Sequence, residues 1–169
     1  AEVERLPRKT KLVDVRWTCE DGTDLVISTT RPELICACGV VVVHPDDERY
    51  RHLVGQRITL PLPTEGRSTT VEIQQHPSVK SEFGTGVLMV CSFGDQNDVA
   101  VFRELGLAPF QAIDLNGTMT EVAGPLKGMP VLEARTRAIE MLDESARLVQ
   151  AVERDQDIPV SERGKNPVE

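Results

Sequence analysis

Two aspartates, Asp95 and Asp98, stand three residues apart shortly after the apolar run Val87–Cys91. The run has the length and composition of a buried strand, so both carboxylates follow a strand and open a helix. One interpretation is structural, because Asp95 can cap that helix with Asp98 at its third position. The other is that the same carboxylates accept hydrogen bonds from a ligand.

A second polar stretch, Thr29–Leu34, also follows an expected strand. Polar residues at two strand ends predict one shared pocket, which favours the ligand-binding interpretation of the aspartates. Gly84 and Gly86 flank Thr85 just before the apolar run. Glycines at such positions suit left-handed backbone or the close approach of a ligand.

Short apolar runs predict the strands that must position these residues. An Asp21-Gly22 turn predicts a hairpin between the first two of them. The expected strands span residues 12–17, 25–28, 39–43, 56–60, 69–73, 87–91, 110–113 and 148–152. Many short strands with few helices favour a closed or nearly closed sheet.

Four helical segments are expected between the strands. Pro32 suits the first position of a short helical turn, and Asp46 is expected to cap a helix over residues 47–54 that Gly55 ends. The helix that starts near Asp95 carries Val101, Phe102 and Leu105 at helical spacing. The longest helix starts at Pro130 and runs to about residue 147, with an apolar stripe of Leu132, Ile139, Leu142 and Ala146.

The chain has 169 residues, 40% hydrophobic composition and a formal net charge of -8. This length predicts one domain with an ordinary core. The acidic balance disfavours a self-sufficient nucleic-acid binder, so any RNA contact must be local or shared. No apolar run approaches the length of a membrane span and the N-terminus lacks a secretory signal, which predicts a cytoplasmic protein.

The four cysteines and three histidines lack the spacing of a metal site, so no metal is expected. Cys36 and Cys38 alternate and would share one face of an extended segment. We interpret the cysteines as small buried apolar side chains.

Four separated motifs carry a family resemblance: ISTTRPE at 27–33, VHP at 43–45, FGTG at 83–86 and GDQND at 94–98. In this order and at these separations they resemble the editing (CP1) domain inserted into valyl-, isoleucyl- and leucyl-tRNA synthetases. The resemblance covers nearly the whole chain and is strongest for the archaeal and eukaryotic valyl form. It implies a mixed α/β fold, with a distorted closed six-stranded β-barrel and short peripheral helices.

The nucleotide-binding signatures HIGH and KMSKS of the synthetase core do not occur in this sequence. The resemblance therefore implies a single editing domain over residues 1–169, with 1–11 and 154–169 as connections to the synthetase core. The expected partners are the remainder of the synthetase and a tRNA 3' end that carries a mischarged amino acid. No cofactor and no membrane contact are expected.

For the valyl form, the resemblance implies hydrolysis of threonyl-tRNA(Val). An apolar pocket cannot strongly reject an added hydroxyl, and the discrimination of valyl enzymes against threonine is the standard example. Asp98 would anchor the substrate's α-ammonium group through a charge-assisted hydrogen bond. Asp95 would accept the threonine hydroxyl, and a valyl group would leave that acceptor unpaired.

The resemblance also assigns the remaining site residues. Thr30 and Arg31 complete the expected catalytic set with Asp95 and Asp98, and together with Thr29 they would organise the pocket. The backbone of Gly84, Thr85 and Gly86 would approach the terminal adenosine.

Leu34, Met89 and Cys91 replace polar residues of the bacterial form, so they would make a more apolar pocket wall. No Ser/His/Asp or Cys/His set stands at matching positions, and no covalent intermediate is expected. A positioned water and backbone donors to the oxyanion would then suffice.

Two other functions remain open at this point. The chain could be an isoleucyl-type domain that clears valyl-tRNA(Ile). It could also be a binding module that holds an aminoacyl-adenosine without hydrolysing it, which the acidic charge and the lack of an obvious base favour.

Overall fold

The computed structural model describes residues 5–92 and 96–159, and the side chains of residues 10–92 and 98–153. Its strands are β1 (Arg5–Cys19), β2 (Asp24–Thr29), β3 (Cys38–Val43), β4 (Arg57–Thr59), β5 (Thr70–Gln75), β6 (Val87–Cys91) and β7 (Leu148–Pro159). The α-helices are α1 (Gln96–Glu104) and α2 (Val131–Glu144), and the 3₁₀-helices are η1 (Pro32–Ala37), η2 (Arg51–Leu53) and η3 (Glu121–Leu126).

Six strands close into a barrel in the order β2-β6-β3-β5-β4-β1, because β1 also pairs with β2. The β2–β6 and β3–β5 pairs are parallel, and the other four barrel pairs are antiparallel. β7 adds a seventh strand along β1. The expected closed six-stranded barrel is confirmed.

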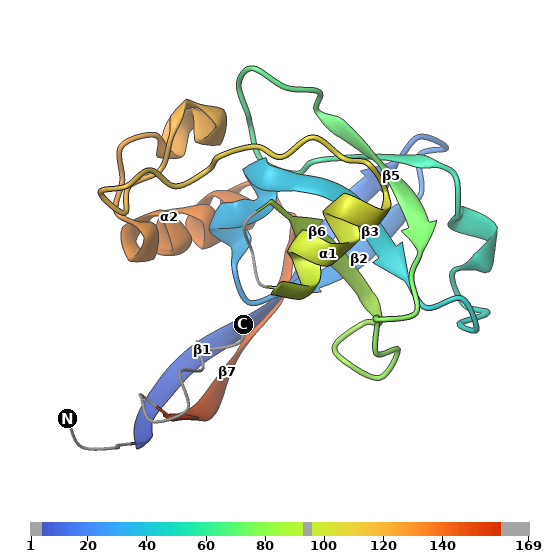
Figure 1. Cartoon of the computed structure of the whole chain (residues 1–169), viewed down its shortest axis with the longest axis horizontal. Helices are drawn as coiled ribbons and strands as arrows, with labels where there is room; N and C mark the ends of the chain where they lie inside the picture. Colours follow the sequence, from blue (N-terminus) through green and yellow to red (C-terminus); the bar gives the residue numbers. More distant parts are fainter. Residues whose placement is uncertain (1–4, 93–95, 160–169) are drawn as a thin grey trace.

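β1 and β7 also pair beyond the barrel, from Arg5 opposite Pro159 to Lys11 opposite Glu153. Figure 1 shows this two-stranded ribbon extending away from the barrel. Both strands are therefore longer than the expected segments 12–17 and 148–152.

The main core fills the barrel with large side chains that are at most 1% exposed, among them Trp17, Ile27, Ile58 and Ile73. A smaller apolar cluster on the outer face of the barrel joins Val40 and Val42 of β3 to Phe102 of α1. A Cβ atom at Gly39 would lie only 2.4 Å from Cζ of Phe102. Glycine at this position therefore lets the ring lie directly on β3, which fixes the helix that carries Asp98.

α2 buries a different face from the expected one. Ala134, Ala138 and Leu142 are buried, whereas Leu132 is 66% exposed. Ala146 lies past the end of the helix with a φ of 62°. The expected stripe is therefore wrong at two of its four positions. Among the described residues, no helix is both long enough and apolar enough to cross a membrane.

The helix expected over residues 47–54 is reduced to η2, whose N-cap residue is Tyr50. Asp46 is therefore not a helix cap, and its N–H instead donates to Nδ1 of His44 at 3.0 Å. Gly55 does end this segment, with a left-handed φ of 95°.

Two further expectations are wrong. Residues 110–113 are not a strand, because only an isolated bridge joins Ile113 to Met119. Cys36 belongs to η1 and Cys38 starts β3, so the two do not alternate along one extended segment. All four cysteines are nonetheless buried and free, as their interpretation as core residues predicts.

Glu33, the second residue of η1, has a side chain with no solvent exposure. Arg135 of α2 donates two hydrogen bonds to this carboxylate, from Nε to Oε1 and from Nη2 to Oε2, both 2.9 Å long. Nε of Arg31 lies 3.5 Å from Oε2 on the same carboxylate. Two guanidinium groups thus offset the desolvation of one carboxylate and fix η1 against α2.

Replacing Arg135 with methionine should lower the free energy of unfolding by about 3–5 kcal/mol, because it removes the bidentate partner of a buried carboxylate. Urea unfolding followed by circular dichroism measures this loss. The double variant Glu33→Met with Arg135→Met should regain much of it, since no buried charge then remains.

Arg137→Met is the matched control, because Arg137 lies on the same helix and pairs only with the exposed residues Glu140 and Glu144. Surface pairs contribute at most about 1 kcal/mol, so this variant should lose little stability. Equal losses for the two arginine variants would contradict the role given to Arg135.

Candidate functional site

The candidate site lies where two parallel strands end. β2 and β6 run in the same direction, with Ser28 opposite Leu88. β2 ends one residue after this pair and β6 continues for three, so β6 extends two residues beyond the end of β2. The segment after β2 reaches the end of β6 through η1, because the Ser92 N–H donates to the carbonyl of Ala37 at 3.0 Å and Leu34 and Ser92 line one cavity. This brings Thr29–Leu34 to the edge from which the chain leads on to Asp98.

Asp98 is the third residue of α1. Its Oδ2 atom accepts the backbone N–H of Cys91 at 3.1 Å, and the residue is partly exposed. The carboxylate therefore caps the end of β6 as well as standing in the first turn of its helix. A carboxylate can accept more than one hydrogen bond, so accepting the Cys91 N–H is compatible with a second role for Asp98.

The turn after β2 is fixed by its own side chains. Oγ1 of Thr29 accepts the N–H of Arg31 at 3.0 Å. Thr30 is 7% exposed and lines a cavity of about 350 Å³ between β1 and α2, together with Lys11 and Thr136. Thr30 therefore faces α2, whereas Leu34 faces a different cavity.

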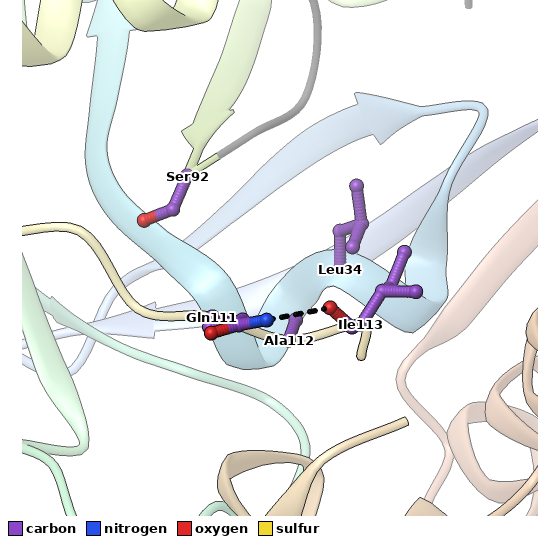
Figure 2. Close-up of a pocket in the computed structure, with 5 residues that line it drawn as sticks. All are labelled: Leu34, Ser92, Gln111, Ala112 and Ile113. Carbon is purple, nitrogen blue, oxygen red and sulfur yellow. Dashed lines mark hydrogen bonds between the residues drawn. The ribbon is translucent and has the colours of Figure 1, made fainter. Parts of the chain in front are cut away.

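That second cavity has a volume of about 330 Å³ and is lined by Leu34, Ser92, Gln111, Ala112 and Ile113. Figure 2 shows Leu34 coming from η1 and Ser92 from the end of β6, while the other three come from the segment that follows α1. Three of its residues are apolar, and Ser92 and Gln111 add polar groups. We call it the Leu34 cavity. It borders both polar stretches of the candidate site.

The Gly84–Gly86 segment lies at the other end of β6 from Asp98. The strand has five residues, which separates the two ends by roughly 15 Å at about 3.3 Å per residue. The Thr85 N–H donates to Oγ of Ser28 at 2.9 Å. A Cβ atom at Gly84 would lie 2.4 Å from this same Oγ, and its φ is 56°. Packing within the protein thus already explains this glycine.

A buried chain of hydrogen bonds continues from Ser28. Its Oγ donates to Oδ1 of Asp14 at 2.7 Å, and Nε2 of Gln150 donates to Oδ2 of the same carboxylate at 2.8 Å. The carbonyl of Thr85 accepts the Tyr50 hydroxyl at 2.6 Å. These contacts connect β1, β2 and β7 to the turn before β6.

The cysteines near the site are poor nucleophiles. Cys91 is 3% exposed, and its hydrogen bond with Cys38 and its burial raise the pKa of its thiol. Burial raises the pKa of Cys36 to about 12. Such thiols stay protonated near neutral pH. Cys91 therefore contributes its backbone N–H to the site, and the half-buried Met89 packs against the barrel core.

A Ser–His–Glu arrangement does exist in the fold, but it lies elsewhere. Nδ1 of His76 is 2.7 Å from Oγ of Ser78, and Nε2 is 2.7 Å from Oε2 of Glu104. The His76 N–H donates to the carbonyl of Val43, which is paired with Val87 at the start of β6. Nδ1 also accepts the Ser78 N–H at 3.1 Å, so these contacts stabilise the turn after β5 and join it to the last residue of α1.

Asp95, expected to accept the substrate hydroxyl, lies outside the described residues. Within the described ranges, no three His, Cys, Asp or Glu side chains are grouped to hold a metal ion.

The sequence interpretation missed two parts of the site. Arg135 stands next to Ala134 on the buried face of α2, and a cation on such a face indicates a buried acidic partner. Gln111, Ala112 and Ile113 were expected only as part of a strand over residues 110–113, and no sequence signal pointed to them as site residues.

No family model matches the chain. Its sequence is 44% identical over 170 residues to the valine–tRNA ligase of Aeropyrum pernix, covering 100% of this chain and 20% of the relative. It is 44% identical over 174 residues to the valine–tRNA ligase of Methanopyrus kandleri, covering 100% of this chain and 19% of the relative. The chain thus spans about a fifth of the length of these relatives.

Two solved structures share the fold. The CP1 domain GlLeuRS-CP1 superimposes with a TM-score of 0.66 at 10% identity, covering 84% of this chain and 98% of that domain. A LeuRS of Agrobacterium radiobacter, solved in a ternary complex with tRNA and LeuAMS, gives a TM-score of 0.63 at 17% identity over 88% of this chain and 20% of that protein. By sequence along its whole length and by fold, the chain belongs to the editing (CP1) domains of the class I aminoacyl-tRNA synthetases and is most like the corresponding segment of valine–tRNA ligase.

Proposed function

We propose that the chain hydrolyses the ester bond of threonyl-tRNA(Val), as the post-transfer editing domain of a valyl-tRNA synthetase. The observation that carries this proposal is the position of Asp98. Its partly exposed carboxylate is tied to the end of β6, at the edge where Thr29–Leu34 also leaves the barrel. The whole-length similarity to valine–tRNA ligases supports the choice of amino acid.

The substrate's α-ammonium group would donate to Asp98, and a charge-assisted bond of this kind is about twice as strong as a neutral one. From that anchor the amino-acid side chain would extend toward the Leu34 cavity. Ser92, which directly follows β6, is one of the residues that line this cavity. Asp95 would accept the threonine hydroxyl. A valyl group would leave this carboxylate desolvated without a donor, so the site would favour the threonyl ester.

Hydrolysis would need no covalent intermediate. Burial keeps the Cys36 and Cys91 thiols protonated, and the His76 chain lies at the opposite end of β6. An aminoacyl ester is already labile, so a positioned water and backbone donors to the oxyanion are sufficient. Arg31, itself next to Glu33, would organise the pocket together with Thr29 and Thr30.

The tRNA 3' end would lie along β6, with its terminal adenosine toward Gly84, Thr85 and Gly86. Such an orientation is consistent with the roughly 15 Å between the two ends of this strand. A LeuRS of the same fold has been solved with tRNA, which supports tRNA as the partner. The net charge of -8 repels phosphate, so whole tRNA should bind this chain weakly and with strong salt dependence.

We also infer that the whole chain is one editing domain, with residues 1–11 and 154–169 as its connections to the synthetase core. The pairing of β1 with β7 from Arg5–Pro159 to Lys11–Glu153 supports this inference. A two-stranded ribbon would carry both connections from the same side of the barrel.

Asp98→Ala should abolish deacylation of threonyl-tRNA(Val), and Asp98→Asn should lower kcat/KM by about 10- to 100-fold. The asparagine can still accept the Cys91 N–H but loses the charge that pairs with ammonium, a bond worth about 1.5–3 kcal/mol. Deacylation of radiolabelled substrate, with thermal unfolding as the control for folding, tests both variants. Retained activity in Asp98→Ala would reject the ammonium anchor.

Asp95→Ala should reduce the preference for threonyl over valyl ester by about 5- to 100-fold, because the unpaired-acceptor penalty of about 1–3 kcal/mol disappears. The measurement compares hydrolysis of threonyl-tRNA(Val), valyl-tRNA(Val) and valyl-tRNA(Ile) by the variant and the unmodified chain. An unchanged threonyl-to-valyl ratio would exclude Asp95 as the hydroxyl acceptor. Faster hydrolysis of valyl-tRNA(Ile) by the unmodified chain would indicate an isoleucyl-type domain instead.

A further inference from the structure

The Leu34 cavity has one wall with little regular structure. Gln111, Ala112 and Ile113 form this wall, which has only the isolated bridge to Met119. Thr120 fixes the middle of this wall, because its N–H donates to the carbonyl of Ala112 at 2.8 Å. The other end of the wall begins at Phe110 and needs its own attachment, because a segment outside the sheet has no ladder to fix it.

Ser92 supplies part of that attachment. Its Oγ accepts the Phe110 N–H at 2.8 Å and donates to the carbonyl of Ala37 at 3.3 Å. One hydroxyl therefore joins the start of the wall to the end of η1. Ser92 itself lines the cavity, directly after β6.

Arg67 makes the second attachment, and it contacts a residue next to each wall of the cavity, Phe110 beside Gln111 and Cys36 in η1. Its guanidinium lies over the Phe110 ring, with 4.3 Å from Cζ to the ring centroid. Its Nη1 donates to the carbonyl of Cys36 at 2.8 Å, two residues after Leu34 in η1. Its Nε donates to the carbonyl of Ser68 at 2.8 Å, which fixes the plane of the group.

The surroundings of Arg67 indicate that its guanidinium positions its neighbours and does not neutralise a carboxylate. Burial lowers the pKa of Arg67, and the ionisable groups that act on it are the thiols of Cys36, Cys38 and Cys91. Within the described part of the chain, no ion pair joins Arg67 to a carboxylate. A planar guanidinium can stack on a ring and donate in its plane at once, which a lysine cannot do.

We propose that Arg67 is a positioning residue that holds Phe110–Ile113 against η1 and so sets which amino-acid side chain the Leu34 cavity admits. This inference rests on the proposed function, in which the side chain of the substrate extends into this cavity. Arg67 does not touch the substrate. It acts through the distance between Leu34 on one wall and Gln111–Ile113 on the other.

Arg67→Lys keeps the charge and loses the stacked, planar donor. Its kcat/KM for threonyl-tRNA(Val) should fall about tenfold while that for valyl-tRNA(Val) falls less, so the threonyl preference drops. Loss of one hydrogen bond and one cation–π contact is consistent with about this factor. Phe110→Leu should change the ratio in the same direction. The double variant should be no worse than the more damaged single variant, because both disrupt one contact.

Arg57→Lys is the matched control. Arg57 lines a neighbouring groove together with Arg67, but its side-chain donors bond, among the described residues, to Oγ1 and the carbonyl of Thr70. Its threonyl-to-valyl ratio should stay within about twofold of the unmodified chain, because it contacts neither wall of the cavity. All ratios are measured well below the unfolding temperature of each variant, so that a loss of stability alone cannot change them.

Three results would overturn the inference. An unchanged ratio in Arg67→Lys rejects the positioning role while leaving the proposed function intact. An equal fall for both esters, with a smaller salt dependence of tRNA binding, assigns Arg67 to a phosphate contact instead. An unmodified chain that hydrolyses neither ester rejects the proposed function, and the inference falls with it.

Discussion

The site depends on the ion pair between the buried carboxylate of Glu33 and the guanidinium of Arg135. An isolated buried charge costs several kcal/mol, so it is stable only with partners that are held in place. Arg135 supplies two parallel hydrogen bonds from α2, and Nε of Arg31 lies 3.5 Å from Oε2 of the same carboxylate. The segment between β2 and β3 is thus fixed at both of its charged residues. This constraint gives Leu34 a defined position at the edge of the barrel.

The second constraint is the parallel pairing of β2 with β6. Closure of the barrel through β1 and β2 makes this pairing part of the fold rather than a feature of the site. It forces the polar segments after both strands to emerge at one edge, where Asp98 caps β6 through the Cys91 N–H. The start of β6 is fixed by the contact of Thr85 with Ser28, the next-to-last residue of β2. Each end can therefore hold a different part of one extended ligand.

The barrel portions of the strands could be predicted from short, largely apolar runs bounded by turn residues, and the Asp21-Gly22 hairpin set the register of the first two. The polar extensions of β1 and β7 could not, because they pair only with each other beyond the barrel. The buried face of α2 could not be predicted from the sequence. Leu132 fits a helical stripe by spacing, yet α2 packs closely against η1 and buries the small Ala134 and Ala138. Close packing selects small residues, which a search for large apolar side chains overlooks. Arg135 was missed for a different reason, because its partner Glu33 is 102 residues away in the sequence.

The wall Gln111–Ile113 shows where prediction from a pattern stops. A strand or a helix can be predicted from the period of its apolar residues, but this segment is held by one or two contacts each from Ser92, Arg67 and Thr120. Its position is therefore decided by residues that lie far away in the chain. In the proposed function Asp98 binds the α-ammonium group, which all amino acids share, so this contact cannot by itself discriminate between amino acids. Discrimination must come from the part of the site that meets the side chain, and there a displacement of a few tenths of an ångström changes which contacts form. A specificity wall without regular structure thus requires rigid attachments, and the guanidinium of Arg67, which joins Phe110 next to this wall to η1 opposite it, meets that requirement.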